Sequence, residues 1–253
     1  MRLALVVEYE GTGYHGFQYQ PGAPTIQEEL ENAIARLDGD RPRIEGAGRT
    51  DAGVHATGQV VAFDTGADHA PATFERALNH HLPDDIAVKA AHAVGDNFDP
   101  RRMALSRRYV YTIYAAAAPS PLIRRTSWHW RKKLNVQRMQ AAARLLVGTH
   151  DFALFAGPLE NPGGSTVREI TEARVSRKGD LVRFEVTGNA FLPHQVRRMA
   201  GALVDVGIGR LTRADVSALV DGSPGDAVAR SLPPHGLCLV EVKYRDFPPR
   251  GGE

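Results

Sequence analysis

The chain has 253 residues, of which 43% are hydrophobic and 24% charged, and its formal net charge is +2. This is the composition of an ordinary folded protein, and the length allows one large domain or two small ones. The sequence contains no run of about 18 apolar residues, which excludes a membrane-spanning helix, and its start predicts no signal peptide. The single cysteine, Cys238, excludes an internal disulfide; it lies in an apolar run, so we expect a buried structural thiol in a cytoplasmic protein.

The charge is distributed unevenly along the chain. The segment from Arg101 to Arg144 holds eleven Lys or Arg residues and no Asp or Glu, which leaves 20 of the 31 basic residues against all 29 acidic ones elsewhere. Such a segment either binds a polyanion or forms a solvated face that pairs with distant acids, and charge alone favours neither. The candidate RNA contacts in it are Arg101, Arg107, Arg108, Arg124, Arg125, Arg131, Lys132 and Lys133.

The first part of the chain is predicted to alternate strands and helices. Residues 3–8 form an apolar strand, and a helix begins at Thr25, where Thr25 and Glu28 have the spacing of a capping box. Apolar residues at helical spacing continue this helix until Gly39 ends it. The further predicted elements are strands near 43–45, 59–64 and 86–94, and a helix at 73–81.

The segment Gly11–Gly16 matches the Gly-x-Gly-x-x-Gly pattern of dinucleotide-binding folds. That function needs a helix to begin at the glycines, whereas Pro21 and Pro24 continue the loop. We therefore reject a nicotinamide-dependent oxidoreductase. The aromatic and amide side chains of this loop are better suited to contact flat polar rings than phosphates.

The second part is predicted to begin near residue 106 with a strand at 106–114. Tyr109, Tyr111 and Ile113 would share one face of it, either as core residues or with one ring offered to a base. The further predicted elements are helices at 135–147, 196–206 and 212–220, a hairpin of 167–177 and 181–187, a loop at 157–165, and a strand at 237–244.

The order strand, loop, helix occurs in residues 2–37 and again in 181–206. This repetition predicts an α+β fold of two similar α/β, RRM-like halves. Their sheets would be mixed, mainly antiparallel and joined into one, with an active-site cleft between the halves. The predicted boundaries are 1–105 for the first half, 106–247 for the second and 248–253 for a tail.

A glycine-rich loop precedes the strand at 59–64 and carries three chemically useful side chains, Arg49, Asp51 and His55. Loops with special backbone needs often carry function, and a nearby guanidinium keeps a carboxylate ionised. The alternative is an ordinary surface ion pair in a turn.

The sequence lacks the residues that other kinds of catalytic site require. The spacing of His and Cys does not fit a metal site, and neither a Walker loop nor a Gly-x-Ser-x-Gly motif is present. What remains suits metal-free covalent or acid–base chemistry on a nucleic acid. A flipped base needs an aromatic platform such as Tyr109, and Asp51 needs a guanidinium, which Arg197 or Arg198 could bring from the other half.

Five segments, in order, resemble the motifs of the tRNA pseudouridine synthase A family. Phe17 stands where that family usually has tryptophan, and Pro193 and Gln195 are unusual in their motif. The segments are EYEGTGYHGFQ (8–18), GRTDAGVHATGQVV (48–61), RYVY (108–111), NAFLPHQVR (189–197) and PHGLCL (234–239).

The resemblance implies a role for each matching residue. Asp51 would be the catalytic nucleophile, Arg49 would take part in flipping the base, Tyr109 would stack on the target uracil, and Arg197 would pair with the aspartate. His55 would be a structural residue of the loop.

The resemblance also implies a reaction and partners: isomerisation of uridine to pseudouridine at positions 38–40 of the anticodon arm of tRNA. No cofactor or metal is implied, and the tRNA would span both subunits of a homodimer. The alternative is a non-catalytic tRNA-binding or folding protein that has the same basic surface without the chemistry.

Overall fold

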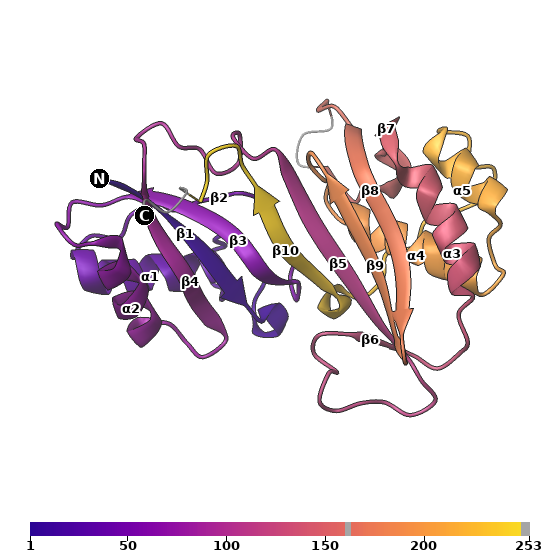
Figure 1. The fold of residues 1–253 in the computed structure, drawn as a ribbon, viewed down its shortest axis with the longest axis horizontal. Helices are drawn as coiled ribbons and strands as arrows, with labels where there is room; N and C mark the ends of the chain where they lie inside the picture. The colour runs from indigo at the N-terminus through magenta and orange to yellow at the C-terminus, as the bar shows by residue number, and fades with distance from the viewer. Residues whose placement is uncertain (160–162, 249–253) are drawn as a thin grey trace. The chain divides into compact units, whose positions relative to one another are not determined.

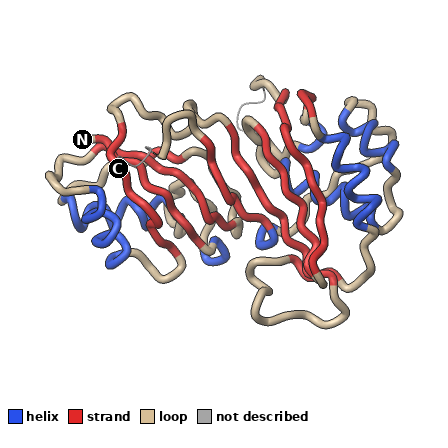
Figure 2. Tube along the Cα trace, in the orientation of Figure 1, coloured by secondary structure: helices blue, strands red, loops and turns tan. Residues whose placement is uncertain are grey.

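The computed structural model describes residues 1–159 and 163–248, which group into two units (Figure 1). Unit 1 consists of Met1–Ser106 together with residues 239–248, and unit 2 is Arg107–Cys238. The chain therefore begins in unit 1, passes through unit 2 and returns. Both units combine helices with mainly antiparallel strands, which confirms the predicted α+β class (Figure 2).

In unit 1, the strands follow the order β4-β1-β3-β10, and β2 pairs with β3. Strand β1 pairs antiparallel with both β3 and β4. Helices α1 and α2 contact each other, and α2 packs on β4 (Figure 1). The elements are β1 (Arg2–Tyr9), α1 (Ile26–Asp38), β2 (Glu45–Gly46), β3 (His55–Asp64), α2 (Pro71–His81), β4 (Ile86–Val94) and most of β10 (Leu237–Lys243).

Helix α1 has the ends that its sequence predicts. The Thr25 hydroxyl accepts a hydrogen bond from the backbone N–H of Glu28 (3.3 Å), which satisfies one of the unpaired donors at a helix start. Gly39 ends the helix in the left-handed region, at φ 81°, where glycine pays little steric cost. The buried side of the helix includes Leu30 and Ile34.

The returning segment packs into the core of unit 1. Val242 and Tyr244 lie against a buried cluster that contains Val60, Phe98 and Phe247. The sequence-based division had grouped residues 106–247 together, whereas these contacts place the residues from Leu239 onward with unit 1. Strand periodicity gives no information on which sheet a closing strand joins, which explains the difference.

In unit 2, the strands follow the order β5-β9-β8-β7. The pairs β5–β9, β9–β8 and β8–β7 are antiparallel, and β6 adds a parallel pair to β5. Helix α3 packs on α4, α5 and β8 (Figure 1). The elements are β5 (Ser106–Ala115), β6 (Trp128–Trp130), α3 (Val136–Ala143), β7 (Gly148–Asp151), β8 (Val167–Lys178), β9 (Leu181–Gly188), α4 (Gln195–Gly207) and α5 (Arg213–Val220), with short 3-10 turns among them.

Two glycines of α4 allow close packing that side chains would prevent. A Cβ at Gly201 would lie 1.9 Å from the carbonyl oxygen of Arg230, and a Cβ at Gly207 would lie 2.8 Å from the Met139 sulfur. The segment that contains Arg230 therefore crosses directly over the helix.

Some expectations fall partly outside the described residues or differ in detail. Within the predicted loop at 157–165, residues 160–162 lie outside them, as do residues 249–253 of the predicted tail. Strands β6 and β7 were not predicted. Cys238, expected to be buried, is half-buried. No helix in the described ranges is long and apolar enough to cross a membrane.

Candidate active site

The loop of residues 47–54 joins β2 to β3 and carries Arg49 and Asp51. The backbone N–H of Ala47 donates to the Val60 carbonyl (2.8 Å), and the N–H of Val54 donates to the Asp51 carbonyl (3.1 Å). Arg49 is exposed and Asp51 is half-buried. The loop therefore presents a guanidinium and a carboxylate two residues apart.

The glycine-rich segment 11–17 packs directly against this loop. A Cβ at Gly11 would lie 2.0 Å from the Val54 carbonyl oxygen. Gly16 has φ +96°, and a Cβ there would lie 2.8 Å from the Thr50 carbonyl oxygen, which also accepts a hydrogen bond from the Phe17 N–H (3.0 Å).

The aromatic residues Tyr14 and Phe17 of this segment are buried. Their rings are packed into the unit, so the expectation that this loop contacts flat ligand rings is not supported for these two residues. The glycines instead allow the segment to support the Asp51 loop.

His55 has a structural position at the end of the loop. Its Nδ1 accepts a hydrogen bond from the Gly11 N–H (3.0 Å), which requires a lone pair on that nitrogen and the ring proton on Nε2. The Glu10 carboxylate lies 3.5 Å from the same Nδ1. The hydrogen bond from Gly11 therefore ties the glycine-rich segment to the first residue of β3.

Tyr109 lies on the buried face of β5, together with Tyr111 and Ile113. It pairs with Val186 of β9, and its ring meets Phe191 edge-on, with ring centroids 5.2 Å apart. The predicted shared face is therefore confirmed. The contact with Phe191 fixes the plane of the Tyr109 ring.

Arg197 lies in the first turn of α4 and is anchored to the segment 229–233. Its Nε donates to the Leu232 carbonyl (2.8 Å), and the Leu232 N–H donates to the Arg197 carbonyl (3.2 Å). The neighbouring Arg198 contacts the Ala229 carbonyl with Nη1 (3.3 Å). Both arginines therefore hold the same crossing segment.

The crossing segment is itself fixed by an ion pair whose carboxylate is buried. The Arg230 Nε donates to both carboxylate oxygens of Asp205 (3.1 and 3.0 Å). The Arg230 guanidinium also lies 5.8 Å from the Trp128 ring centroid and 5.9 Å from that of Trp130. Charge and aromatic contacts thus hold the backbone that holds Arg197.

Tyr111 adds a further anchor. Its hydroxyl donates to the Pro233 carbonyl (2.8 Å). Burial raises the pKa of Tyr111 above the ordinary tyrosine value, although the positive charges of Arg197 and Arg230 act in the opposite direction. The hydroxyl therefore keeps its proton and continues to donate.

The predicted RNA contacts differ in exposure. Arg107 is only 8% exposed, and its Nη1 donates to the Asn189 carbonyl (2.6 Å), so its guanidinium has a structural contact within unit 2. Arg108 is half-buried, 3.9 Å from the Glu185 carboxylate. The exposed members are Arg101, Arg124, Arg125, Arg131, Lys132 and Lys133.

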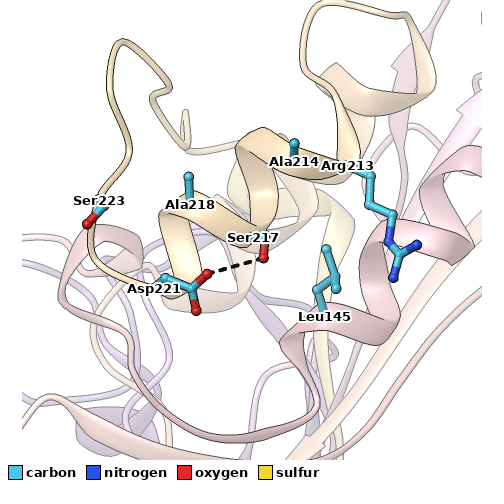
Figure 3. Close-up of a pocket in the computed structure, with 7 residues that line it drawn as sticks. All are labelled: Leu145, Arg213, Ala214, Ser217, Ala218, Asp221 and Ser223. Atoms are coloured by element: carbon cyan, nitrogen blue, oxygen red, sulfur yellow. Dashed lines mark hydrogen bonds between the residues drawn. The ribbon is translucent and has the colours of Figure 1, made fainter.

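A shallow pocket lies on α5 of unit 2 (Figure 3). Leu145 and residues of α5 line it, including Arg213 and Ser217, and the Ser217 hydroxyl donates to Asp221 (3.2 Å). In Figure 3 this pair lies at the C-terminal end of α5. None of the predicted site residues lines this pocket.

The predicted site residues thus come from two units. Arg49 and Asp51 share one loop of unit 1, while Tyr109 and Arg197 belong to β5 and α4 of unit 2. Sequence reasoning missed the side chains that hold these residues in place. A polar residue inside an apolar stretch was the available signal, as for Gln59 in β3 and Asp205 in α4.

Metal ligands do not cluster in the described structure. Within residues 1–159 and 163–248, no group of three or more His, Cys, Asp or Glu side chains could hold a metal ion.

A family model described as tRNA pseudouridine synthase matches residues 5–101 and 142–245. The first segment includes the Asp51 loop and the second includes Arg197. Tyr109 and the basic stretch 124–133 lie between the two matched segments.

Curated proteins named tRNA pseudouridine synthase A are similar to the chain over nearly its whole length. The protein from Geotalea daltonii is 42% identical over 242 residues, which cover 96% of this chain and 99% of that protein. The one from Myxococcus xanthus is 44% identical over 249 residues, covering 98% and 94%. The one from Bacillus subtilis is 40% identical over 246 residues, covering 96% and 99%.

Proposed function

We propose that this chain, which belongs to the tRNA pseudouridine synthase family, isomerises uridine to pseudouridine in the anticodon stem-loop of tRNA, with Asp51 as its nucleophile. Membership makes the chain a tRNA-modifying isomerase. The choice of positions 38–40 and the roles of individual residues are proposals that rest on the motifs and on the geometry of each unit.

The observation that carries the proposal is the way in which the loop presents Asp51. The loop is supported by a glycine-rich segment that reaches its backbone at Thr50 and Val54. A carboxylate that must attack one atom needs such a fixed backbone, because reaction requires the two atoms to approach in a narrow range of geometry.

In the proposed reaction, the Asp51 carboxylate attacks either C1′ of the ribose or C6 of the uracil. The bond between N1 and C1′ breaks, the uracil rotates, and C5 bonds to C1′. The bond between Asp51 and the nucleotide also breaks: C5 displaces the carboxylate from C1′ in the first case, and the carboxylate leaves C6 in the second. C5 then loses its proton to solvent and N1 gains one, so atoms and charge balance without an oxidant, a reductant or a metal.

The remaining roles follow the chemistry of the side chains. The Tyr109 ring, oriented by Phe191, would stack on the extruded uracil, an interaction worth about 1–3 kcal/mol for a base on an aromatic ring. Arg49 would take part in extruding the base. Arg197 would pair with the ionised Asp51.

The exposed basic residues would contact the tRNA backbone. Arg101, Arg124, Arg125 and the run Arg131–Lys133 are exposed, and phosphates bind such side chains in a salt-dependent manner. Arg108 would contribute from its half-buried position.

A homodimer in the cytoplasm is part of the same proposal. The measurement for the dimer is the solution mass by analytical ultracentrifugation, which should give twice the chain's 27.5 kDa. A mass of one chain at micromolar concentration would contradict it.

The reaction can be followed through the hydrogen that it releases. A tRNA transcript carrying tritium at uracil C5 should lose it to water with the wild-type protein and retain it with Asp51→Ala. Asp221→Asn serves as a control, since it removes an exposed carboxylate on α5. Release by both Asp51→Ala and wild type would contradict the catalytic role, and release by neither would favour the non-catalytic tRNA-binding alternative.

The target positions need a separate measurement. Transcripts in which cytidine replaces uridine at position 38, 39 or 40 should each lose the tritium release that belongs to that position. Unchanged release from a transcript without any of the three uridines would contradict the anticodon-arm assignment.

A further inference from the structure

Three buried polar side chains form a chain of hydrogen bonds that reaches the Asp51 loop. The Gln59 side-chain N–H donates to the Gly48 carbonyl (2.7 Å) and approaches the Tyr9 hydroxyl (3.4 Å). The Tyr9 hydroxyl lies 2.9 Å from the Thr50 hydroxyl. Because Tyr9 Oη accepts from Gln59, its own proton can be donated to Thr50 Oγ1.

These bonds reach the loop at the residues next to the functional ones. Gly48 and Thr50 lie on either side of Arg49, and Thr50 directly precedes Asp51. Tyr9, Thr50 and Gln59 are all buried, whereas Arg49 is exposed and Asp51 half-buried. The three side chains come from β1, the loop and β3, so the sheet of unit 1 is connected directly to the backbone that carries Asp51.

We propose that Tyr9, Thr50 and Gln59 are positioning residues for the isomerisation. They fix the backbone of residues 48–51 and thereby set where the Asp51 carboxylate stands. The inference rests on the proposed catalytic role of Asp51. All three residues are buried and form hydrogen bonds within unit 1, so we assign them no contact with a reacting atom.

The expected consequence is a loss of turnover without a loss of tRNA binding. A misplacement of about 1 Å at a reacting group costs a rate factor on the order of 100. Thr50→Val and Tyr9→Phe each delete one hydroxyl with little change of shape. We expect each to lower kcat about 10- to 100-fold and to leave KM within about twofold, as measured by tritium release.

Unit 1 offers a matched control for each variant. Thr65 is 5% exposed and Thr50 6%, and the Thr65 hydroxyl also donates a hydrogen bond, to Asp38 (2.6 Å). The Tyr244 hydroxyl donates to the Pro100 carbonyl (2.7 Å). Thr65→Val and Tyr244→Phe should therefore lower stability to a similar degree while keeping wild-type kcat.

Two further variants separate positioning from general stability. Thr50→Ser keeps the hydroxyl and should restore most of the turnover that Thr50→Val loses. The double variant Tyr9→Phe/Thr50→Val should be little slower than the slower single variant, because both changes remove the same hydrogen bond. Rates are compared well below the melting temperature of every variant.

Asp51→Ala is measured in parallel so that two failures can be told apart. If Asp51→Ala retains activity, the proposed function fails. If Asp51→Ala is inactive while Tyr9→Phe and Thr50→Val keep wild-type kcat, or lose no more than their controls, the positioning role fails and the catalytic role stands. If Thr50→Val does not fold, Tyr9→Phe against Tyr244→Phe decides the question by the same criterion.

Discussion

The loop that carries Asp51 and the helix start that carries Arg197 are fixed by different kinds of interaction. The loop is held by neutral hydrogen bonds among Tyr9, Thr50 and Gln59 and by glycine backbone at close approach. Arg197 is held by a backbone carbonyl of a segment that the Asp205–Arg230 ion pair fixes in turn. Loss of charge should therefore harm the second region, whereas added bulk should harm both, the first at Gly16 and the second at Gly201.

The largest effect expected on the Asp51 loop is steric. Gly16→Ala places a Cβ 2.8 Å from the Thr50 carbonyl oxygen at φ +96°. Overpacking and a left-handed backbone together should cost about 3 kcal/mol of unfolding free energy, and turnover should fall with it. Denaturant unfolding and tritium release measure the two effects.

Gly22→Ala is the matched control for this change. Gly22 also has positive φ, at 76°, but a Cβ there would meet nothing within 4 Å. It should cost only about 1 kcal/mol and leave turnover intact. Equal losses from the two variants would show that the contact with the loop is unimportant.

The next effect is the loss of charge in unit 2. Asp205→Asn removes the carboxylate charge that pairs with Arg230 (3.0 Å) and Arg210 (3.5 Å), a change that costs about 3–5 kcal/mol when both partners are fully buried. Because the Arg230 side chain is 35% exposed, we expect about 2 kcal/mol by denaturant unfolding. Asp221→Asn on α5 should change stability by less than about 0.5 kcal/mol, and equal effects would contradict the structural importance assigned to the pair.

A smaller effect should distinguish the two arginines of α4. Arg197→Lys loses the Nε donor to the Leu232 carbonyl, and Arg198→Lys loses a longer contact to Ala229. Lysine cannot reproduce the planar guanidinium, so Arg197→Lys should lower kcat about tenfold, given one lost charge-assisted bond. Arg198→Lys should change kcat less. The reverse order would identify Arg198 as the partner of Asp51.

The smallest effect on chemistry should come from the exposed basic run. Changing Arg131, Lys132 and Lys133 together to alanine should reduce the slope of log affinity against log salt by about 2 to 3, while saturating turnover remains. Filter binding over a range of salt measures the slope. The control is the variant in which alanine replaces Arg174, Arg177 and Lys178, which are exposed basic residues of β8. An equal change of the salt slope in this control would contradict a specific contact between residues 131–133 and the tRNA backbone.

The sequence was informative where local patterns decide the structure. The capped helix α1 and the alternating strand β5 follow from capping and periodicity. Strand β6 escaped prediction because three residues carry no usable period. Strand β7 escaped it because its four residues, Gly148–Asp151, include no apolar side chain.

The candidate site could be predicted only in part from the sequence. The motifs singled out Asp51, but they did not show that Gly16 and Gln59 hold its loop, since these contacts join residues more than ten positions apart. The sequence showed that Arg107 is charged, but it could not show that its guanidinium donates a hydrogen bond to the Asn189 carbonyl. Long-range packing thus decided which polar residues are structural.

The most direct test of the central claim compares binding and chemistry on one preparation of Asp51→Asn, which removes the charge and keeps the shape. The account predicts tRNA affinity within about threefold of wild type and no tritium release at saturating protein in a single turnover. Tritium release by Asp51→Asn at the wild-type rate would contradict the assignment of Asp51 as the nucleophile.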